Sequence, residues 1–185
     1  MKLFETDFKG LFVIEPNIFS DKRGCFFESY SDKIFKENDL NYNWVQDNES
    51  HSSYGTIRGL HFQKGEWAQA KLVRCVYGKV LDVVVDIRDG SPTYGKHFSI
   101  ELSGENKKMM LIPRGFAHGF STLSGRAIFQ YKCDNLYNKQ SEGGILYNDS
   151  KLNIDWKVEG VPIVSDKDKL NMKFEDYDLF SRHII

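Results

Sequence analysis

The sequence carries no surplus of charge of one sign. Its 25 Lys and Arg residues stand against 26 Asp and Glu residues, so the formal net charge is -1. Proteins that attract nucleic acid or anionic membrane surfaces over long range present a strong basic surplus. We therefore expect no nucleic-acid partner and no membrane partner, and a site for an anion must be assembled from a few local side chains.

Long hydrophobic segments and paired cysteines are also missing. The longest apolar run, Val80 to Val85, is interrupted by Asp82, and the first five residues have no hydrophobic core of signal-peptide length. The cysteines are few, odd in number and widely spaced: Cys25, Cys75 and Cys133. Reduced thiols that pack as small hydrophobes fit this usage. We expect a cytoplasmic protein in which all three cysteines are structural.

Proline is scarce, and the four prolines are scattered so that they mark no linker. A chain of 185 residues is long enough for one domain with a sizeable core. We expect residues 1–185 to form a single domain. Its part from about residue 134 loses the strand rhythm and is predicted to be rich in loops with some helix.

Short stretches rich in Val, Ile, Tyr and Phe recur between Gly, Asn and Asp, which is typical of an all-β sandwich or barrel with antiparallel pairing. The predicted strands are Leu11–Pro16, Cys25–Tyr30, Tyr42–Ser52, Thr56–Gln63, Lys71–Tyr77, Lys79–Ile87, His97–Leu102, Lys108–Ile112, Gly119–Leu123 and Arg126–Cys133. Helical periodicity is scarce. Two short helices are expected, one over Asp32–Glu37 capped by Ser31 and one over Phe174–Phe180.

His61 lies in an otherwise apolar predicted strand, and strand alternation puts it on the same face as Gln63. If a carboxylate holds one nitrogen of a buried imidazole, the other nitrogen can accept a proton near neutral pH. His61 is therefore a candidate general base, although a lone histidine on a strand is more often a hydrogen-bonded core residue.

A second histidine, His118, follows a turn at Pro113 and Gly115 and re-enters the sheet. The spacing Pro-x-Gly-x-x-His is also the second half of a metal-binding cupin signature. The first half fails, because Gln63 stands where a second histidine of His-x-His is needed. Three strong ligands cannot be assembled from these motifs, although a site of two histidines and one carboxylate stays formally open.

Two further polar residues lie on predicted strands. Lys71 and Arg74 are three residues apart, so one can face the interior of a barrel and the other the exterior. A lysine that starts a strand is usually solvated. Tyr131 is normally half-buried packing with a hydrogen-bonded hydroxyl, and only the geometry of its partners could make it an acid.

Five motifs stand in order along the chain: Asp21–Glu28, Gln46–Ser50, Arg58–Gln63, Gln69–Arg74 and Pro113–Phe120. They are followed by Tyr131, Tyr137, Glu142, Asp155, Trp156 and Ser165–Asp168. From about Thr6 to Asp168, this series resembles the dTDP-4-dehydrorhamnose 3,5-epimerase family.

The resemblance implies a cupin-like antiparallel β-barrel (jelly roll) that dimerises by exchanging strands and uses no metal and no organic cofactor. The implied substrate is a dTDP-linked 4-keto-6-deoxyhexose, epimerised at C3 and C5 on the route to dTDP-L-rhamnose. His61 would be the base, supported by Asp168 (with Asp166 as a less favoured rival), Tyr131 would return a proton from the opposite face, and Lys71 would stabilise charge on the C4 oxygen.

The resemblance also implies a set of substrate-binding residues: Arg23, Phe26, Glu28, Gln46, Asn48, Arg58, His118, Tyr137, Glu142 and Lys167. One conflict stands out, because Arg58 and His61 differ in strand parity. They can share a face only if a bulge lies between them; otherwise Arg58 serves the neighbouring subunit's site. His51, His97 and His183 belong to no motif and receive no role.

Four alternatives stay open at this point. A monofunctional 3- or 5-epimerase would use the same residues, and a 3,4-ketoisomerase is less favoured because His61, Lys71 and Tyr131 are all present. A metal-dependent cupin enzyme would need His61 and His118 as ligands. A sugar-nucleotide-binding protein without activity would bind ligand but exchange no hydrogen at C3 or C5.

Overall fold

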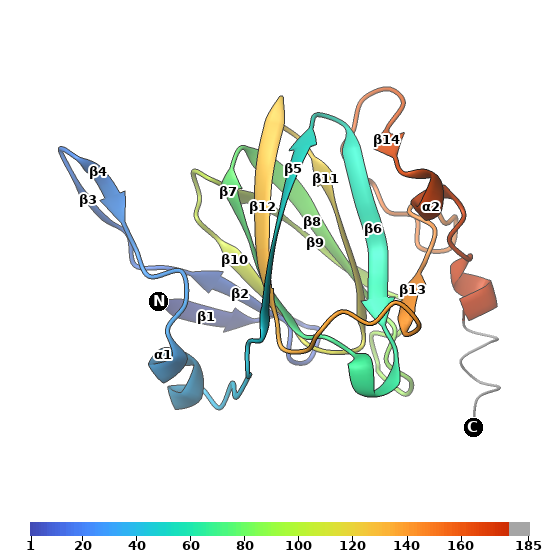
Figure 1. The fold of residues 1–185 in the computed structure, drawn as a ribbon, viewed down its shortest axis with the longest axis horizontal. Helices are drawn as coiled ribbons and strands as arrows, with labels where there is room; N and C mark the ends of the chain where they lie inside the picture. Colours follow the sequence, from blue (N-terminus) through green and yellow to red (C-terminus); the bar gives the residue numbers. More distant parts are fainter. Residues whose placement is uncertain (178–185) are drawn as a thin grey trace.

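The computed structural model describes residues 1–177, and it is built from two β-sheets that face each other (Figure 1). The first sheet has the order β1-β2-β10-β7-β12-β5 and its neighbouring strands are all antiparallel. Its strands are β1 (Lys2–Glu5), β2 (Phe12–Glu15), β10 (Met109–Ile112), β7 (Lys71–Tyr77), β12 (Arg126–Cys133) and β5 (Gln46–Ser53).

The second sheet has the order β13-β6-β11-β8-β9, and a short strand, β14, pairs in parallel with β6. Its strands are β13 (Glu142–Gly144), β6 (Thr56–Gln63), β11 (Phe116–Thr122), β8 (Lys79–Asp86), β9 (His97–Ser103) and β14 (Ile163–Val164). The fold class expected from the sequence, an all-β antiparallel barrel with short helices, is confirmed.

Short elements lie outside the two sheets. Strands β3 (Phe19–Asp21) and β4 (Gly24–Phe26) form a hairpin that projects away from the barrel (Figure 1). The helical elements are α1 (Asp32–Glu37), a 3-10 turn (Gly65–Trp67) and α2 (Asp166–Lys169). In the described part of the chain, no helix is long and apolar enough to cross a membrane.

Hydrophobic side chains pack in three layers. Between the sheets lies a cluster that includes Val73, Val84 and Phe129. On the outer face of the second sheet, Leu60 and Trp156 belong to a cluster made with residues of the C-terminal segment. The outer face of the first sheet is partly covered by the N-terminal segment and α1. The loop-rich C-terminal segment is therefore a cover that buries one face of the barrel.

Strand β6 contains a bulge between Arg58 and His61, which resolves the difference in their strand parity. His61 pairs with His118, whereas Arg58 pairs with Phe120, so β6 holds one more residue than β11 over this stretch. Gly59 has φ +124, and a Cβ atom there would come within 2.5 Å of the Cα atom of Gly119. Glycine is required for this close crossing of two strands, and the bulge lets Arg58 and His61 share one face.

Several local expectations were wrong. The strand predicted over Cys25–Tyr30 ends at Phe26, and the strand predicted over Gly119–Leu123 begins earlier, at Phe116. Ser31 precedes α1 but its side chain makes no capping hydrogen bond. Cys25 is exposed on the β3–β4 hairpin and is not a core residue, whereas the two other cysteines are buried.

The second predicted helix begins as expected, because residues 174–177 are helical. Its remaining residues, 178–180, lie outside the described part of the chain, as does His183. The very short elements β1, β3, β13, β14 and α2 were not predicted from the sequence.

Candidate active site

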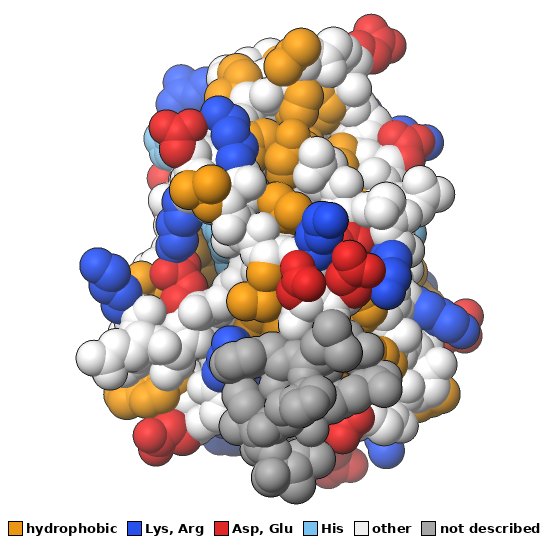
Figure 2. Space-filling model, turned by 90° about the vertical axis from the view of Figure 1, so that its right-hand side faces the viewer, with side chains coloured by type: hydrophobic (Ala, Val, Ile, Leu, Met, Phe, Trp, Pro, Cys, Tyr) orange, Lys and Arg blue, Asp and Glu red, His pale blue; other side chains and the backbone are white. Residues whose placement is uncertain are grey.

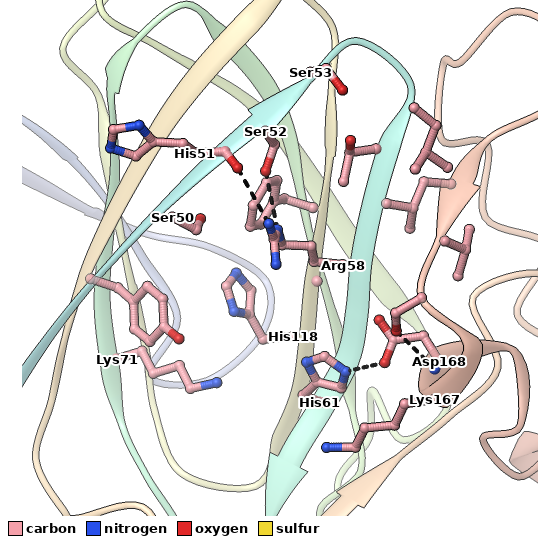
Figure 3. Close-up of a pocket in the computed structure, with 18 residues that line it drawn as sticks. Ser50, His51, Ser52, Ser53, Arg58, His61, Lys71, His118, Lys167 and Asp168 are labelled. Carbon is pink, nitrogen blue, oxygen red and sulfur yellow. Dashed lines mark hydrogen bonds and ion pairs between the residues drawn. The ribbon is translucent and has the colours of Figure 1, made fainter.

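A cavity of about 640 Å³ lies between the two sheets. The first sheet contributes residues of β5, β7 and β12, the second contributes residues of β6 and β11, and the segment from β14 to α2 lines one side. Among the cavity residues are Arg58, His61, Lys71, His118, Tyr131, Lys167 and Asp168 (Figure 3). The interior-facing positions of strands that are far apart in sequence thus meet in one place.

His61 and Asp168 form a hydrogen-bonded dyad at the wall made by β6 and α2. The Nε2 atom of His61 lies 2.6 Å from Oδ1 of Asp168, and 34% of the histidine side chain but only 5% of the aspartate side chain is exposed. The carboxylate therefore accepts a hydrogen bond from Nε2–H on the buried side of the ring. Nδ1 faces the cavity, where it can accept a proton (Figure 3).

Helix α2 positions Asp168. The Ser165 hydroxyl caps this helix by accepting a hydrogen bond from the Asp168 backbone N–H at 3.1 Å. The Gly59 N–H points to Oδ2 of Asp168 at 3.4 Å, so the bulge in β6 also contributes to the dyad. Burial by itself raises the pKa of Asp168, but hydrogen bonds from His61, Gly59 and Ser165 outweigh burial and lower it. Asp168 is ionised at neutral pH.

Lys71 and Tyr131 come from the opposite wall of the cavity. The Lys71 Nζ atom lies 5.6 Å from the centroid of the Tyr131 ring. Burial lowers the pKa of Lys71, and electrostatic interactions with Cys133, Asp82 and Glu142 oppose this effect. Burial raises the pKa of Tyr131, so its hydroxyl keeps its proton at neutral pH. Arg74, as the spacing predicted, points to the other face of β7, where it binds Gln130.

His118 lies buried between the sheets, whereas Arg58 is exposed at the β5 side of the cavity. The Nε2 atom of His118 is 2.6 Å from Oδ1 of Asp82, and both side chains are buried. Burial lowers the pKa of His118 and raises that of Asp82. The Arg58 side chain donates to the Ser52 hydroxyl at 3.1 Å and to the His51 backbone carbonyl at 3.3 Å. These contacts fix the guanidinium at the β5 side of the cavity.

A chain of hydrogen bonds extends from Lys167 along one edge of the cavity. Its Nζ atom lies 2.6 Å from the Glu142 carboxylate, which accepts from the Tyr137 hydroxyl at 3.0 Å. The Tyr137 backbone N–H donates to Gln46 at 3.1 Å, and Gln46 donates to Asn48 at 3.0 Å. Five residues expected to bind substrate are thereby joined to one another, and one of them lines the cavity.

Comparison with known proteins identifies the family. A family model described as dTDP-4-dehydrorhamnose 3,5-epimerase matches residues 5–176. The chain belongs to this family. It is 49% identical over 181 residues to a dTDP-4-dehydrorhamnose 3,5-epimerase of Shigella flexneri, covering 97% of this chain and 99% of the relative.

Two solved structures of the family are similar along nearly their whole length. One is a dTDP-4-dehydrorhamnose 3,5-epimerase from Elizabethkingia anophelis NUHP1, with 55% identity, a TM-score of 0.91, and 95% of this chain and 97% of that chain covered. The other, from Legionella pneumophila Philadelphia 1, is a dTDP-6-deoxy-D-glucose-3,5-epimerase in complex with dTDP-4-keto-L-rhamnose. It has 44% identity and a TM-score of 0.90, and the match covers 94% of this chain and 93% of that chain.

Three residues that the family resemblance assigned to substrate binding lie away from the cavity. Arg23 and Phe26 belong to the projecting β3–β4 hairpin and Glu28 follows it. The Arg23 side chain is 85% exposed and forms an ion pair with Asp21 at 2.6 Å, and Phe26 is 68% exposed. Within one chain these residues do not reach His61, so their assignment stays a prediction.

The sequence reasoning missed several residues that shape the site. Asp82 was noted only as a break in an apolar run, yet it is buried and holds His118. Ser52 and Ser165 orient Arg58 and Asp168. A charged residue inside a run of buried valines was the one available signal, because a buried charge needs a partner.

Among the residues that the structure describes, the two cavity histidines form no metal site with a third ligand. Each Nε2 atom is bonded to a different carboxylate, His61 to Asp168 and His118 to Asp82. Over residues 1–177, no group of three or more His, Cys, Asp or Glu side chains is arranged to hold a metal ion.

Proposed function

We propose that the chain is a dTDP-4-dehydrorhamnose 3,5-epimerase that converts dTDP-4-dehydro-6-deoxy-D-glucose to dTDP-4-dehydro-L-rhamnose. The observation that carries this proposal is the placement of a carboxylate-supported base on one wall of the cavity and a protonated tyrosine on the other. Inversion of a carbon needs a proton removed from one face and another delivered to the opposite face.

In the proposed mechanism, Nδ1 of His61 removes the proton from C3 or C5 of the sugar. The C4 ketone makes both protons acidic, because the electron pair of the broken C–H bond moves into an enolate with its charge on the C4 oxygen. The Lys71 ammonium stabilises that oxygen. Asp168 holds the ring of His61 in one tautomer and stabilises the imidazolium that forms.

The second half of each inversion uses Tyr131. Its hydroxyl keeps its proton at neutral pH because burial raises the phenol pKa, and it lies across the cavity from β6. The phenol donates its proton to the carbon from the face opposite His61, and the enolate electron pair forms the new C–H bond. Proton exchange with water then restores both side chains for the next carbon.

Nucleotide binding is proposed to involve a second copy of the chain. The β3–β4 hairpin projects from the barrel with Arg23 and Phe26 exposed, and β5 lies at the edge of the first sheet. A hairpin of the partner that pairs with this edge would carry Arg23, Phe26 and Glu28 to the cavity. The arginine fork suits a diphosphate.

Co-expression of two inactive variants tests the shared site. If Arg23 acts in the partner's cavity, a heterodimer of Arg23→Ala and His61→Asn chains contains one site with both native residues and regains activity. If Arg23 serves its own chain, both sites of that heterodimer lack one residue and activity stays absent.

The proposed enzyme needs no metal and no organic cofactor, and its three free cysteines suit the reducing cytoplasm. We propose no nucleic-acid or membrane partner. On the face that the C-terminal segment covers, acidic and basic side chains are intermixed with exposed hydrophobic ones and form no large basic patch (Figure 2).

Deuterium exchange tests the activity directly. Metal-stripped protein is incubated with dTDP-4-keto-6-deoxyglucose in deuterated water, and C3 and C5 are followed by NMR and mass spectrometry with a coupled NADPH-dependent ketoreductase. Deuterium at both carbons with an L-rhamnose product supports the proposal. Deuterium at one carbon identifies a monofunctional epimerase, and activity restored only by iron or manganese identifies a metal-dependent cupin enzyme.

A further inference from the structure

Asp82 is a fully buried carboxylate at the centre of the barrel. It lies in β8, where it pairs with Phe120 of β11 and Ile100 of β9, and its exposure is 0%. The residues two positions away on the strand, Val80 and Val84, belong to the cluster between the sheets. Strand alternation therefore directs the Asp82 side chain inward, toward the cavity side of the barrel.

One oxygen of Asp82 is engaged and the other is not. Oδ1 accepts a hydrogen bond from Nε2 of His118 at 2.6 Å. Oδ2 is buried and has no hydrogen-bond partner among the described residues. A buried carboxylate with a free oxygen costs stability unless nearby positive charge compensates it, so its place in an apolar strand calls for a role other than packing.

The lysine that interacts with Asp82 inside the barrel is Lys71. Asp82 and Lys71 act electrostatically on each other, and both act on His118. Lys71 makes no ion pair within 4.0 Å in the described part of the chain, so its ammonium is not neutralised by direct contact. Figure 3 shows its amine pointing to the part of the cavity where His61 and His118 lie.

The charged and titratable groups around this cluster come from several strands. Facing Lys71 are Asp82 of β8, His118 of β11, His61 of β6, Glu142 of β13, and Tyr131 and Cys133 of β12. Asp82 interacts electrostatically with both Lys71 and His118. Removing its charge therefore affects Lys71 and His118 and leaves the His61–Asp168 dyad in place.

We propose that Asp82 is a positioning residue of the reaction: it fixes the His118 ring through Nε2 and supplies the negative charge that keeps the Lys71 ammonium protonated inside the barrel. This inference rests on the proposed function, in which the Lys71 ammonium stabilises the enolate oxygen. A neutral amine at Lys71 would leave that oxygen without its charge partner, because burial works against the protonated form.

The variant Asp82→Asn removes the negative charge of the side chain and keeps its shape. Its amide oxygen can still accept the hydrogen bond from His118, while the negative charge is gone. We expect kcat to fall about 10- to 100-fold with KM within about threefold of wild type. The upper pKa of the pH-rate profile should move down by about one unit. The melting temperature should hold or rise, because a buried charge with one unbonded oxygen is removed.

Asp86→Asn is the matched control. Asp86 lies on the same strand with the same exposure of 0%, but its carboxylate binds Arg88, Ser91 and Thr93 away from the cavity. This variant should lose stability and leave the pH-rate profile unchanged. A merely structural Asp82 would behave in the same way, and an unchanged profile in Asp82→Asn overturns the proposal.

A second measurement does not depend on turnover. Acetylation of Lys71 by acetic anhydride is followed against pH by mass spectrometry in the wild type, Asp82→Asn and Asp86→Asn. The pH at which Lys71 acetylation is half-maximal should fall by about one unit in Asp82→Asn alone. Equal midpoints in all three proteins overturn the inference. If the wild type exchanges no hydrogen in the sugar while the midpoint shifts as expected, the proposed function fails and the charge role of Asp82 stands.

Discussion

Replacing Asp168 by asparagine tests the central feature of the site. Asp168→Asn keeps the size of the side chain, so the short helix α2 and its Ser165 cap are preserved. It removes the charge that receives Nε2–H of His61 at 2.6 Å. An amide can also present its NH2 group to the ring, which favours the tautomer with the proton on Nδ1 and so blocks the proton acceptor.

The expected loss follows from these two effects. Loss of the carboxylate that orients a catalytic histidine costs about 10³- to 10⁴-fold in kcat in comparable dyads. Hydrogen bonds to a charged group contribute about 1.5–3 kcal/mol, so the free energy of unfolding should fall by about that amount. The aspartate side chain is only 5% exposed, so solvent does not replace the lost contact.

The assay is solvent deuterium incorporation at C3 and C5, with urea denaturation to measure the free energy of unfolding. Asp166→Asn is the control, because Asp166 is in the same helix and its side chain is 97% exposed and bound to Lys169. Its exchange rate should stay within about twofold of wild type. Equal losses in the two variants, or an Asp168→Asn protein that exchanges at the wild-type rate, would refute the role of the dyad.

Three further predictions concern other parts of the site. Tyr131→Phe should retain deuterium exchange at the sugar while the yield of inverted product falls, because abstraction by His61 does not need the phenol; product analysis by NMR checks this. Gly59→Ala should lower the free energy of unfolding by about 2–5 kcal/mol, because φ is +124 and the new Cβ meets Gly119 at 2.5 Å, whereas Gly125→Ala, with open space, should be nearly neutral in the same denaturation assay. Burial raises the pKa of Asp168, but its hydrogen bonds lower the pKa by more, so the folded-state pKa lies below the unfolded value. The difference in unfolding free energy between wild type and Asp168→Asn should therefore be full above about pH 4 and shrink as the pH falls through the folded-state pKa.

Much of the barrel could be predicted because its strands alternate in a regular pattern. The predicted bounds of β6, β7 and β12 agree with the structure at both ends. Strands of two or three residues, such as β13 and β14, could not be predicted, since their extended conformation comes from pairing with β6 and not from their own composition.

The site was predicted less evenly than the fold. His61 could be singled out because a histidine stood in an apolar strand, but its carboxylate lies 107 positions later in the chain. No local pattern connects two residues at that separation, so Asp168 rested on family resemblance alone. Its preference over Asp166 has a physical basis in the structure, because the third residue of α2 faces β6 and the first faces solvent.

The bulge in β6 shows why correct strand prediction does not suffice to place a site. In a regular strand Arg58 and His61 would point to opposite faces, and one of them would be lost from the cavity. The outer cluster contains Ile57 and Leu60, three positions apart as well, so the whole strand shifts phase across Gly59. A glycine inside a strand pattern signals a bulge or a close approach, and here it marks both. The N–H of Gly59 also points to the Asp168 carboxylate. The bulge that brings Arg58 and His61 to one face therefore also helps to hold the carboxylate that supports His61.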